Sequence, residues 1–293
     1  MSPAVFIVGD GPVGVALATS LRAAGIPVLG LHGRDAERTA RRGAQAGVLG
    51  SGGRLPAAAT EADVVVIAVS DRKISEVAAE IGQALGAPGG ARVVLHTAGS
   101  LASALALAPI RSRVAGVGTW HPLLSITATG TSALRLPGAA FGIEGDAPAV
   151  ARARQLCAAL GARALELRPG TLALYHAGAV LASNYVVALS EIAARLFEKA
   201  GIGRQDAVAG LSALLASVAQ NLARAGLPEA LTGPIVRGDV ASVERHLEAL
   251  AQSAPAFLDL YQRLGEETLE LARQRQPGPS AQAVARLTKL LSH

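Results

Sequence analysis

The first half of the chain carries short apolar runs of mostly β-branched residues, and these runs limit its possible folds most strongly. Residues 64–69 read Val-Val-Val-Ile-Ala-Val, without a polar position. A strand with one solvated face alternates apolar and polar residues, so a continuous run predicts a strand buried on both faces. Similar runs place strands at 4–8, 27–31, 64–69, 92–96, 114–118, 140–143 and 164–167. The intervening segments can hold crossover helices, which predicts a doubly wound parallel α/β sheet.

The strand signals stop after residue 169, and helical patterns follow. Helices are expected at 171–200, 205–225, 240–252, 255–274 and 280–291, separated by Gly and Pro. This change predicts two domains, a sheet domain over 1–169 and an all-helical domain over 170–293. The most apolar stretch, 173–189, has only 17 residues and includes polar side chains, so a buried core helix is expected there in place of a membrane span.

Charge and cysteine content exclude several classes of protein. The 27 Lys and Arg residues against 22 Asp and Glu residues are scattered, apart from a cluster at 34–42, and only 3% of residues are aromatic. Nucleic-acid binding is therefore not expected. The single Cys157 cannot form a disulfide within the chain or a Cys-rich metal site. With no targeting segment recognised, a cytoplasmic protein with no membrane association is expected.

A glycine motif follows the first expected strand and opens an amphipathic helix. Its residues are Gly9, Asp10, Gly11, Pro12, Val13 and Gly14. In such a motif the first glycine permits a tight turn, the second admits a pyrophosphate and the third lets the helix and strand pack closely. The strand-turn-helix context predicts dinucleotide binding, and an ordinary tight turn is the alternative.

The end of the second strand indicates which dinucleotide binds. An NAD site would place an acidic residue there, but this chain has Leu-His-Gly-Arg at 31–34. Arg34 is best placed to bind a 2′-phosphate through its planar guanidinium. NADP(H) is therefore predicted over NAD(H). The alternative is that Arg34 and its neighbours Arg38, Arg41 and Arg42 form a solvated helix face.

Polar residues and a glycine also follow later strands, at the edge where open α/β sheets bind ligands. Ser70 follows the strand at 64–69, and Thr97 and Gly99 follow the strand at 92–96. We expect these residues to line the nicotinamide side of the cofactor cleft. For the neighbouring Asp71 and Ser100, a role as helix N-caps is supported as well as a place in the cofactor cleft, and the two are compatible.

Two histidines are candidate catalytic residues. His121 directly follows the strand at 114–118, near the same sheet edge, and His176 lies early in the long helix with Ser183 and Asn184 further along it. Hydride transfer to a carbonyl or imine requires a proton donor, so a histidine donor with Asn184 as an orienting amide is the expected chemistry. For His96 and the remaining histidines a structural role is favoured.

A polar, turn-rich segment at 231–239 interrupts the helices. Arg237 could bind a substrate carboxylate, Thr232 and Ser183 could add hydroxyl contacts, and Asp239 could cap the next helix. A metal site built from His121, His176 and Asp239 is disfavoured because the chain has no ligand-spacing motif.

Taken together, these motifs resemble those of a group of bacterial Rossmann-like oxidoreductases whose helical C-terminal domain is of unknown function. The resemblance rests on the glycine motif and on further segments along the chain, at 95–99, 121–123, 175–177, 183–185, 231–234, 237–239 and His246. It implies an NADP-binding domain, a helical domain similar to that of 6-phosphogluconate dehydrogenase, and a homodimer formed through those helices.

The wider superfamily includes pyrroline-5-carboxylate reductase, ketopantoate reductase, β-hydroxyacid dehydrogenases and prephenate dehydrogenase. The His-Pro pair at 121–122 is similar to the His-Pro segment of prephenate dehydrogenases, whose histidine takes part in catalysis. Hydroxyacid dehydrogenases and ketopantoate reductases use a Lys followed by Asn, but this long helix has no Lys before Lys199, so His176 and Asn184 would fill those roles. The resemblance favours an NADP(H)-dependent oxidoreductase for a small carbonyl, imine or hydroxyacid. The alternative is a nucleotide-binding sensor or scaffold without turnover.

Overall fold

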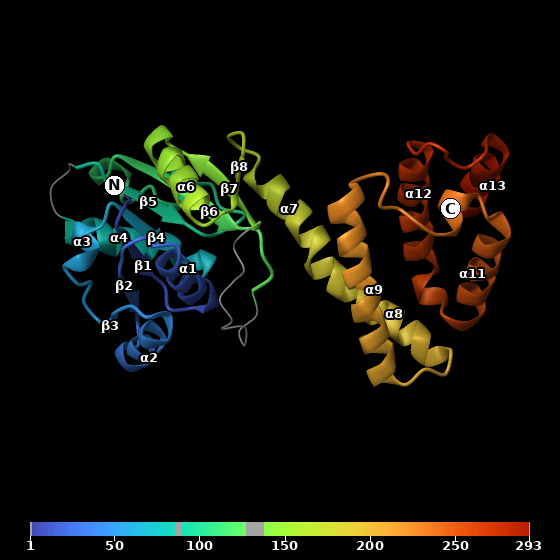
Figure 1. The fold of residues 1–293 in the computed structure, drawn as a ribbon, viewed down its shortest axis with the longest axis horizontal. Coiled ribbons are helices and arrows are strands. Elements are labelled where there is room, and N and C mark those ends of the chain that lie inside the picture. Colours follow the sequence, from blue (N-terminus) through green and yellow to red (C-terminus); the bar gives the residue numbers. More distant parts are fainter. Residues whose placement is uncertain (1, 86–89, 127–137, 293) are drawn as a thin grey trace. The chain divides into compact units, whose positions relative to one another are not determined.

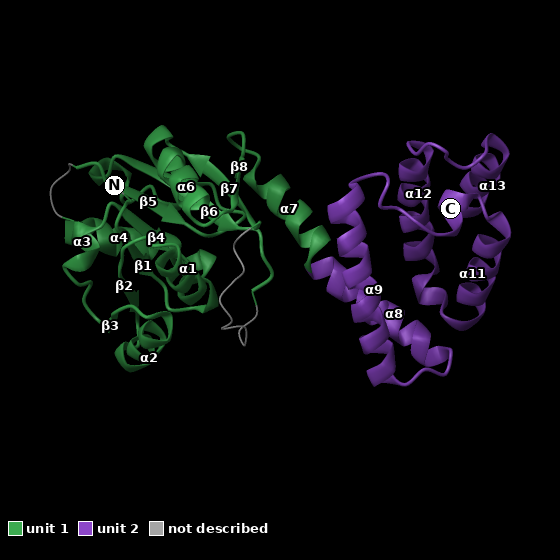
Figure 2. Ribbon diagram, viewed as in Figure 1, with its two compact units in different colours: residues 1–183 green, residues 184–293 purple. Residues whose placement is uncertain are grey.

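The computed structural model describes residues 2–85, 90–126 and 138–292. The chain divides into two compact units, residues 1–183 and 184–293 (Figure 2). Unit 1 contains the sheet and unit 2 is helical. The division lies one helix, α7 (Leu172–Ala182), beyond the predicted boundary at residue 169, and the functional boundary stays a prediction.

Within the described residues, eight strands form a single sheet in the order β3-β2-β1-β4-β5-β6-β7-β8 (Figure 1). They are β1 Val5–Val8, β2 Val28–Gly33, β3 Gly50–Gly52, β4 Val64–Ile67, β5 Val93–His96, β6 Gly116–Pro122, β7 Ala140–Gly145 and β8 Arg163–Glu166. The strands from β3 to β6 are parallel, as expected. By contrast, β7 is antiparallel to β6, and β8 is parallel to β7, so the sheet is mixed. The hydrophobic pattern indicates burial and carries no information on strand direction.

Helices cover both faces of this sheet, which confirms the doubly wound α/β fold class. Their bounds are α1 Pro12–Ala23, α2 Ala36–Ala46, α3 Ala58–Glu61, α4 Ile74–Leu85, α5 Ser103–Ala106 and α6 Ala147–Ala159, with short 3-10 helices η1 Asp71–Lys73 and η2 Arg111–Arg113. One apolar core lies between the sheet and α1, α2 and α6, and another lies between the sheet and α3, α4 and α5. All four side chains of β4 are completely buried, as the run at 64–69 predicts.

Unit 2 contains the helices α8 Asn184–Lys199, α9 Arg204–Ala225, α10 Pro234–Arg237, α11 Val240–Ser253, η3 Pro255–Phe257, α12 Leu258–Arg273 and α13 Ala281–Leu291. The last helices enclose a core that includes Val243, Leu269 and Leu287. The single helix expected over 171–200 is interrupted at Ser183, which separates α7 from α8. The Ser183 hydroxyl donates to the Ala179 carbonyl at 2.6 Å, a back-bond that is typical of bent helices.

The apolar helices that begin at residue 172 are exposed in this chain. Leu172–Lys199 and Arg204–Ala225 are long and apolar enough to cross a membrane, by length and composition alone, and only 6% and 11% of their most apolar windows is buried. The expectation of a buried core helix at 173–189 is therefore wrong for the single chain. Leu174, Leu181 and Val187 are each at least 60% exposed, which leaves a large apolar surface on these helices.

Candidate active site

The turn between β1 and α1 has the geometry that a pyrophosphate-binding loop requires. Gly9 has a φ of +127°, and a Cβ there would lie 2.2 Å from the Ala68 carbonyl oxygen. A Cβ on Gly14 would lie 1.9 Å from the Gly9 carbonyl oxygen, whereas a Cβ on Gly11 would meet open space. Side chains are thus excluded at positions 9 and 14, and Gly11 is the N-cap residue of α1. These residues fit a dinucleotide phosphate.

The side chain of Asp10 binds residues of α2. Its carboxylate accepts hydrogen bonds from Arg38 Nε at 2.7 Å and from Thr39 Oγ1 at 3.1 Å. Burial disfavours the charged carboxylate, but these hydrogen bonds and the charges of Arg38 and Arg42 outweigh it and lower the pKa of Asp10. Asp10 therefore neutralises Arg38. Arg34 is exposed and makes no hydrogen bond or ion pair within the described part of the chain, which leaves its guanidinium available to an anion.

The other predicted cofactor residues lie at the carboxyl ends of neighbouring strands. Ser70 follows β4 and is exposed, Thr97 follows β5 and is half-buried, and Gly99 is buried. Because β1, β4, β5 and β6 are adjacent and parallel, these segments and the glycine turn share one edge of the sheet. Their contacts with a cofactor stay predictions.

His121, on β6, contacts Tyr175 of α7. Its Nδ1 lies 3.1 Å from the Tyr175 hydroxyl, and the two rings meet edge to face with centroids 5.6 Å apart. Tyr175 packs over Gly142 of β7, the cross-strand partner of His121, where a Cβ would lie 2.6 Å from the tyrosine ring. Tyr175 was not among the predicted site residues, because a tyrosine on an apolar helix is typical of a packed core.

His176, the next residue on α7, also meets His121. The two imidazole centroids are 5.7 Å apart, and the ring planes are inclined by 78°. Both rings press against Gly99, where a Cβ would lie 2.3 Å from His176 Cδ2 and 2.8 Å from His121 Nε2. The fold therefore brings together His121, His176 and Gly99, which were predicted from three separate segments.

Burial shifts the pKa values of two groups in this cluster, His121 and Tyr175. Burial lowers the pKa of His121 to about 4; the neighbouring His176 imidazole adds to this shift, and Asp71 partly opposes it. Burial raises the pKa of the Tyr175 hydroxyl, and a hydrogen bond from the Gly142 N–H partly opposes that shift. At neutral pH the cluster therefore contains a neutral imidazole at His121 and a protonated phenol at Tyr175.

The remaining predicted residues lie near the start of unit 2 or within it. Ser183 lies at the interruption between α7 and α8, and Asn184 is the first residue of α8. Thr232 and Arg237 are exposed, with Arg237 at the end of α10. Asp239 caps α11 by accepting a backbone N–H at 3.1 Å, which confirms its predicted cap. The roles of Ser183, Asn184, Thr232 and Arg237 toward a substrate stay predictions.

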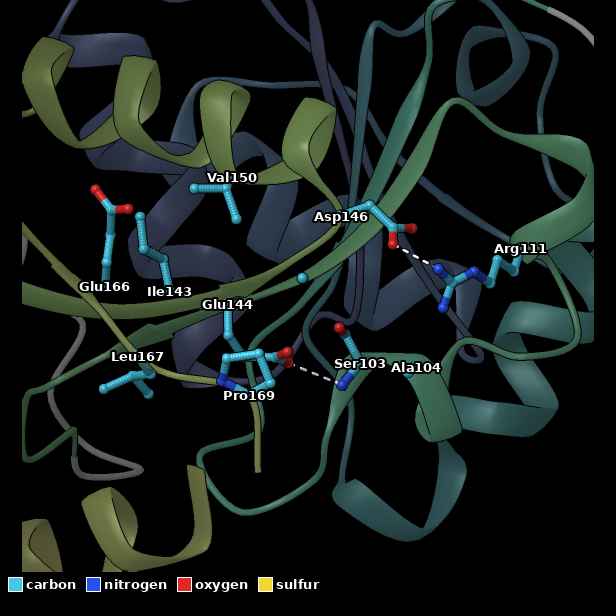
Figure 3. A pocket seen from close by; sticks show the side chains of 11 residues that line it. Ser103, Ala104, Arg111, Ile143, Glu144, Asp146, Val150, Glu166, Leu167 and Pro169 are labelled. Atoms are coloured by element: carbon cyan, nitrogen blue, oxygen red, sulfur yellow. Dashed lines mark hydrogen bonds and ion pairs between the residues drawn. The ribbon is translucent and has the colours of Figure 1, made fainter. Parts of the chain in front are cut away.

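Among the residues that the structure describes, cavities open in unit 1 near β2 and near β7. One, of about 440 Å³, lies at the end of β2 and includes His32, Arg54 and Glu80. The other, of about 370 Å³, lies beside β7 and includes Glu144 and Asp146, with an ion pair between Asp146 and Arg111 at 2.6 Å (Figure 3). Among the described residues, no group of three His, Cys, Asp or Glu side chains could hold a metal ion.

Comparison with protein families gives two matches. Residues 4–88 match a family described as NADP oxidoreductase, coenzyme F420-dependent. Residues 139–268 match a domain of unknown function, DUF2520. No protein of curated function matches the sequence. The first match covers the glycine turn and the end of β2, where NADP(H) binding was predicted.

Solved structures share the fold over nearly the whole chain. Protein TM1727 from Thermotoga maritima has a TM-score of 0.68 and 24% identity, covering 92% of this chain and 100% of its own. A pyrroline-5-carboxylate reductase from Coxiella burnetii has a TM-score of 0.64 and 14% identity, with full coverage of both chains. The Plasmodium falciparum pyrroline carboxylate reductase, solved with NADP bound, has a TM-score of 0.58 and 14% identity, covering 99% and 97%.

At these identities the solved structures show that the fold is shared, and the sequence match shows an NADP oxidoreductase domain over residues 4–88. The fold, the glycine turn and that match agree on the cofactor. The chain therefore contains an NADP oxidoreductase domain over residues 4–88, with NADP(H) as cofactor, and a DUF2520 domain over residues 139–268, which begins at β7 of the sheet and extends into the helices.

Proposed function

We propose that this protein is an NADP(H)-dependent enzyme that transfers a hydride to or from a small carbonyl, imine or hydroxyacid compound. The observation that carries the proposal is the cluster of His121, Tyr175 and His176 around Gly99, on the sheet edge that also holds the glycine turn. The bound cofactor would supply or accept the hydride. The protein must then deliver or remove a proton at the reacting oxygen or nitrogen.

His121 is the proposed proton donor, with His176 as the second candidate. The Gly142 N–H approaches the Tyr175 oxygen, so the tyrosine hydroxyl can direct its own proton to His121 Nδ1. In that arrangement His121 carries its ring proton on Nε2, the nitrogen beside Gly99. A substrate carboxylate bound nearby would raise the pKa of His121 and favour the imidazolium that donates the proton.

The substrate is proposed to carry a carboxylate. Arg237 would bind that group through its planar guanidinium, from the same or the partner subunit, and Asn184 would orient the reacting carbonyl or imine. Ser183 and Thr232 would add hydroxyl contacts. The pyrroline carboxylate reductases that share the fold are named for a cyclic imine with a carboxylate, so compounds of that class are the first to test.

The cofactor is proposed to lie along the carboxyl edge of the sheet. The loop from Gly9 to Gly14, including Gly11, Pro12 and Val13, would hold the pyrophosphate at the start of α1. Ser70, Thr97 and Gly99 would line the nicotinamide side. Arg34 would bind the 2′-phosphate, which its exposed guanidinium supports.

The protein is further proposed to be a cytoplasmic homodimer that pairs through its helices. The exposed apolar faces of the helices at Leu172–Lys199 and Arg204–Ala225 support a second copy as the partner. The single cysteine, Cys157, is buried and forms no disulfide, which is compatible with a reducing compartment.

A substrate panel tests the proposal. NADPH oxidation would be followed with ketoacids and cyclic imines, and NADP⁺ reduction with hydroxyacids. We expect turnover with at least one class, and we expect His121→Ala to lose turnover while it still binds NADPH. Wild-type activity in both His121→Ala and His176→Ala would contradict the assigned roles. NADPH binding with no turnover across the panel would instead favour a nucleotide-binding sensor or scaffold.

A further inference from the structure

A chain of hydrogen bonds crosses three strands beside the candidate active site. His96 ends β5 and pairs in register with Thr119 of β6, which pairs in turn with Glu144 of β7. Directly paired residues on adjacent strands place their side chains on the same face of a sheet. Both His96 and Thr119 are completely buried, so their polar atoms depend on one another for hydrogen bonds.

The hydrogen bond from Ala98 fixes the direction of those that link His96, Thr119 and Glu144. The Ala98 N–H donates to His96 Nδ1 at 3.1 Å, so that nitrogen carries no proton. The neutral imidazole must then carry its proton on Nε2, which lies 3.1 Å from Thr119 Oγ1. The Thr119 hydroxyl in turn donates to Glu144 Oε1 at 2.5 Å. Burial lowers the pKa of His96 to about 4, which agrees with a neutral ring.

The same chain holds both ends of the loop between β5 and α5. His96 accepts from Ala98 near the start of that loop, and Glu144 Oε1 accepts from the backbone N–H of Ser103, the first residue of α5, at 2.9 Å (Figure 3). Between these two anchors lies Gly99, against the imidazoles of His121 and His176. Movement of either anchor would therefore move the surface on which both imidazoles rest.

We infer that His96, Thr119 and Glu144 are positioning residues, which fix the loop at 97–102 and thereby the imidazoles of His121 and His176. The sequence alone favoured a purely structural role for His96. The inference rests on the proposed function only in taking those two imidazoles as the reacting groups. A chain that merely joined the strands would stabilise the sheet without affecting the two imidazoles, and this difference can be measured.

Thr119→Val tests the inference because it keeps the side-chain shape and removes the hydroxyl that links His96 to Glu144. We expect the imidazole ¹H–¹⁵N signals of His121 and His176 to shift, and the His96 Nε2 signal to shift because that nitrogen loses the Thr119 hydroxyl as its partner. With a substrate from the panel, kcat should fall by about 100-fold, the scale expected for misplaced catalytic groups, with little change in KM. Thr119→Ser should restore the signals and the rate.

Thr60→Val is the matched control, because its hydroxyl also makes one hydrogen bond, to the Ala57 carbonyl at 2.7 Å, outside this chain. It should change neither the imidazole signals nor the rate.

If Thr119→Val does not fold, Glu144→Gln replaces it and should shift the same signals, since an amide weakens both hydrogen bonds to Glu144. Unchanged signals and rate in a folded variant would overturn the inference. Absence of turnover in the wild type would count against the proposed function alone, since the imidazole spectra still decide the positioning role.

Discussion

Arg34 differs from the nearby arginines in its lack of an acidic partner within the described chain, whereas Arg38 is paired with Asp10 and Arg41 with Glu37. Charge-assisted hydrogen bonds are worth about 1.5–3 kcal/mol, so Arg34→Ala should raise the NADPH Kd by about 10- to 100-fold and leave the NADH Kd unchanged. Fluorescence titration with both cofactors measures this. Arg41→Ala is the control and should bind both like the wild type. An unchanged NADPH Kd in Arg34→Ala would refute the assignment of the 2′-phosphate.

Gly99 has no room for a side chain between the two imidazoles, since a Cβ would lie 2.3 Å from His176 Cδ2. Gly99→Ala should therefore displace His121 or His176 and lower kcat by about 100-fold or more, while the folded protein retains NADPH binding. Gly82→Ala is a matched control in the same unit, because its Cβ would meet neighbours at an ordinary 3.5 Å. Normal turnover in Gly99→Ala would show that the histidine pair does not act in the reaction.

At the scale of elements, β5 carries the buried His96 and β6 carries the half-buried His121, and both are neutral in the folded state at pH 7. The pKa values of His96 and His121 lie at about 4, below the ordinary 6.5. Between these two values the unfolded chain binds protons that the folded chain does not, so stability should fall as the pH falls from 6.5 to 4. For the fully buried His96 the loss should be on the order of 3 kcal/mol. Urea unfolding at pH 7 and pH 4.5 would measure it.

His96→Gln provides the control for that pH dependence. Glutamine keeps a hydrogen-bonding group near the position of Nε2 but does not titrate, so this variant should lose less stability between pH 7 and pH 4.5 than the wild type does. An identical loss in both proteins would mean that groups other than His96 determine the acid sensitivity.

The elements that could be predicted from sequence are those whose buried positions form a run or a periodic pattern of apolar residues. The β4 run shows this most clearly, whereas β3 reads Gly-Ser-Gly and is held by backbone pairing with β2, so no apolar signal marks it. The convergence of His121 and His176 depends on α7 returning to β7, where Gly142 admits Tyr175. That contact joins residues far apart in sequence, and neither periodicity nor spacing encodes it.

At the scale of the whole molecule, the largest unexplained feature is the apolar surface of the helices at Leu172–Lys199 and Arg204–Ala225. A large exposed apolar surface is typical of a site that contacts another protein or lipid. The same helices carry exposed ion pairs, including Arg195 with Glu191 at 2.9 Å and Arg204 with Glu198 at 3.4 Å. Charged pairs of this kind are costly in the hydrocarbon of a bilayer and ordinary at the rim of a protein interface, which favours a second copy of the chain.

A charge placed in that surface should separate the two copies. Val187 is 71% exposed on α8, and Val187→Asp should raise the dimer Kd by about 30-fold or more if it lies within the buried core of the interface. Sedimentation velocity over a concentration series measures this. Leu49→Asp is the control, since Leu49 is 75% exposed in unit 1, outside these helices, and the variant should remain dimeric. A wild-type protein that is monomeric at micromolar concentration, or that floats with lipid vesicles, would show that something other than a second copy covers these helices.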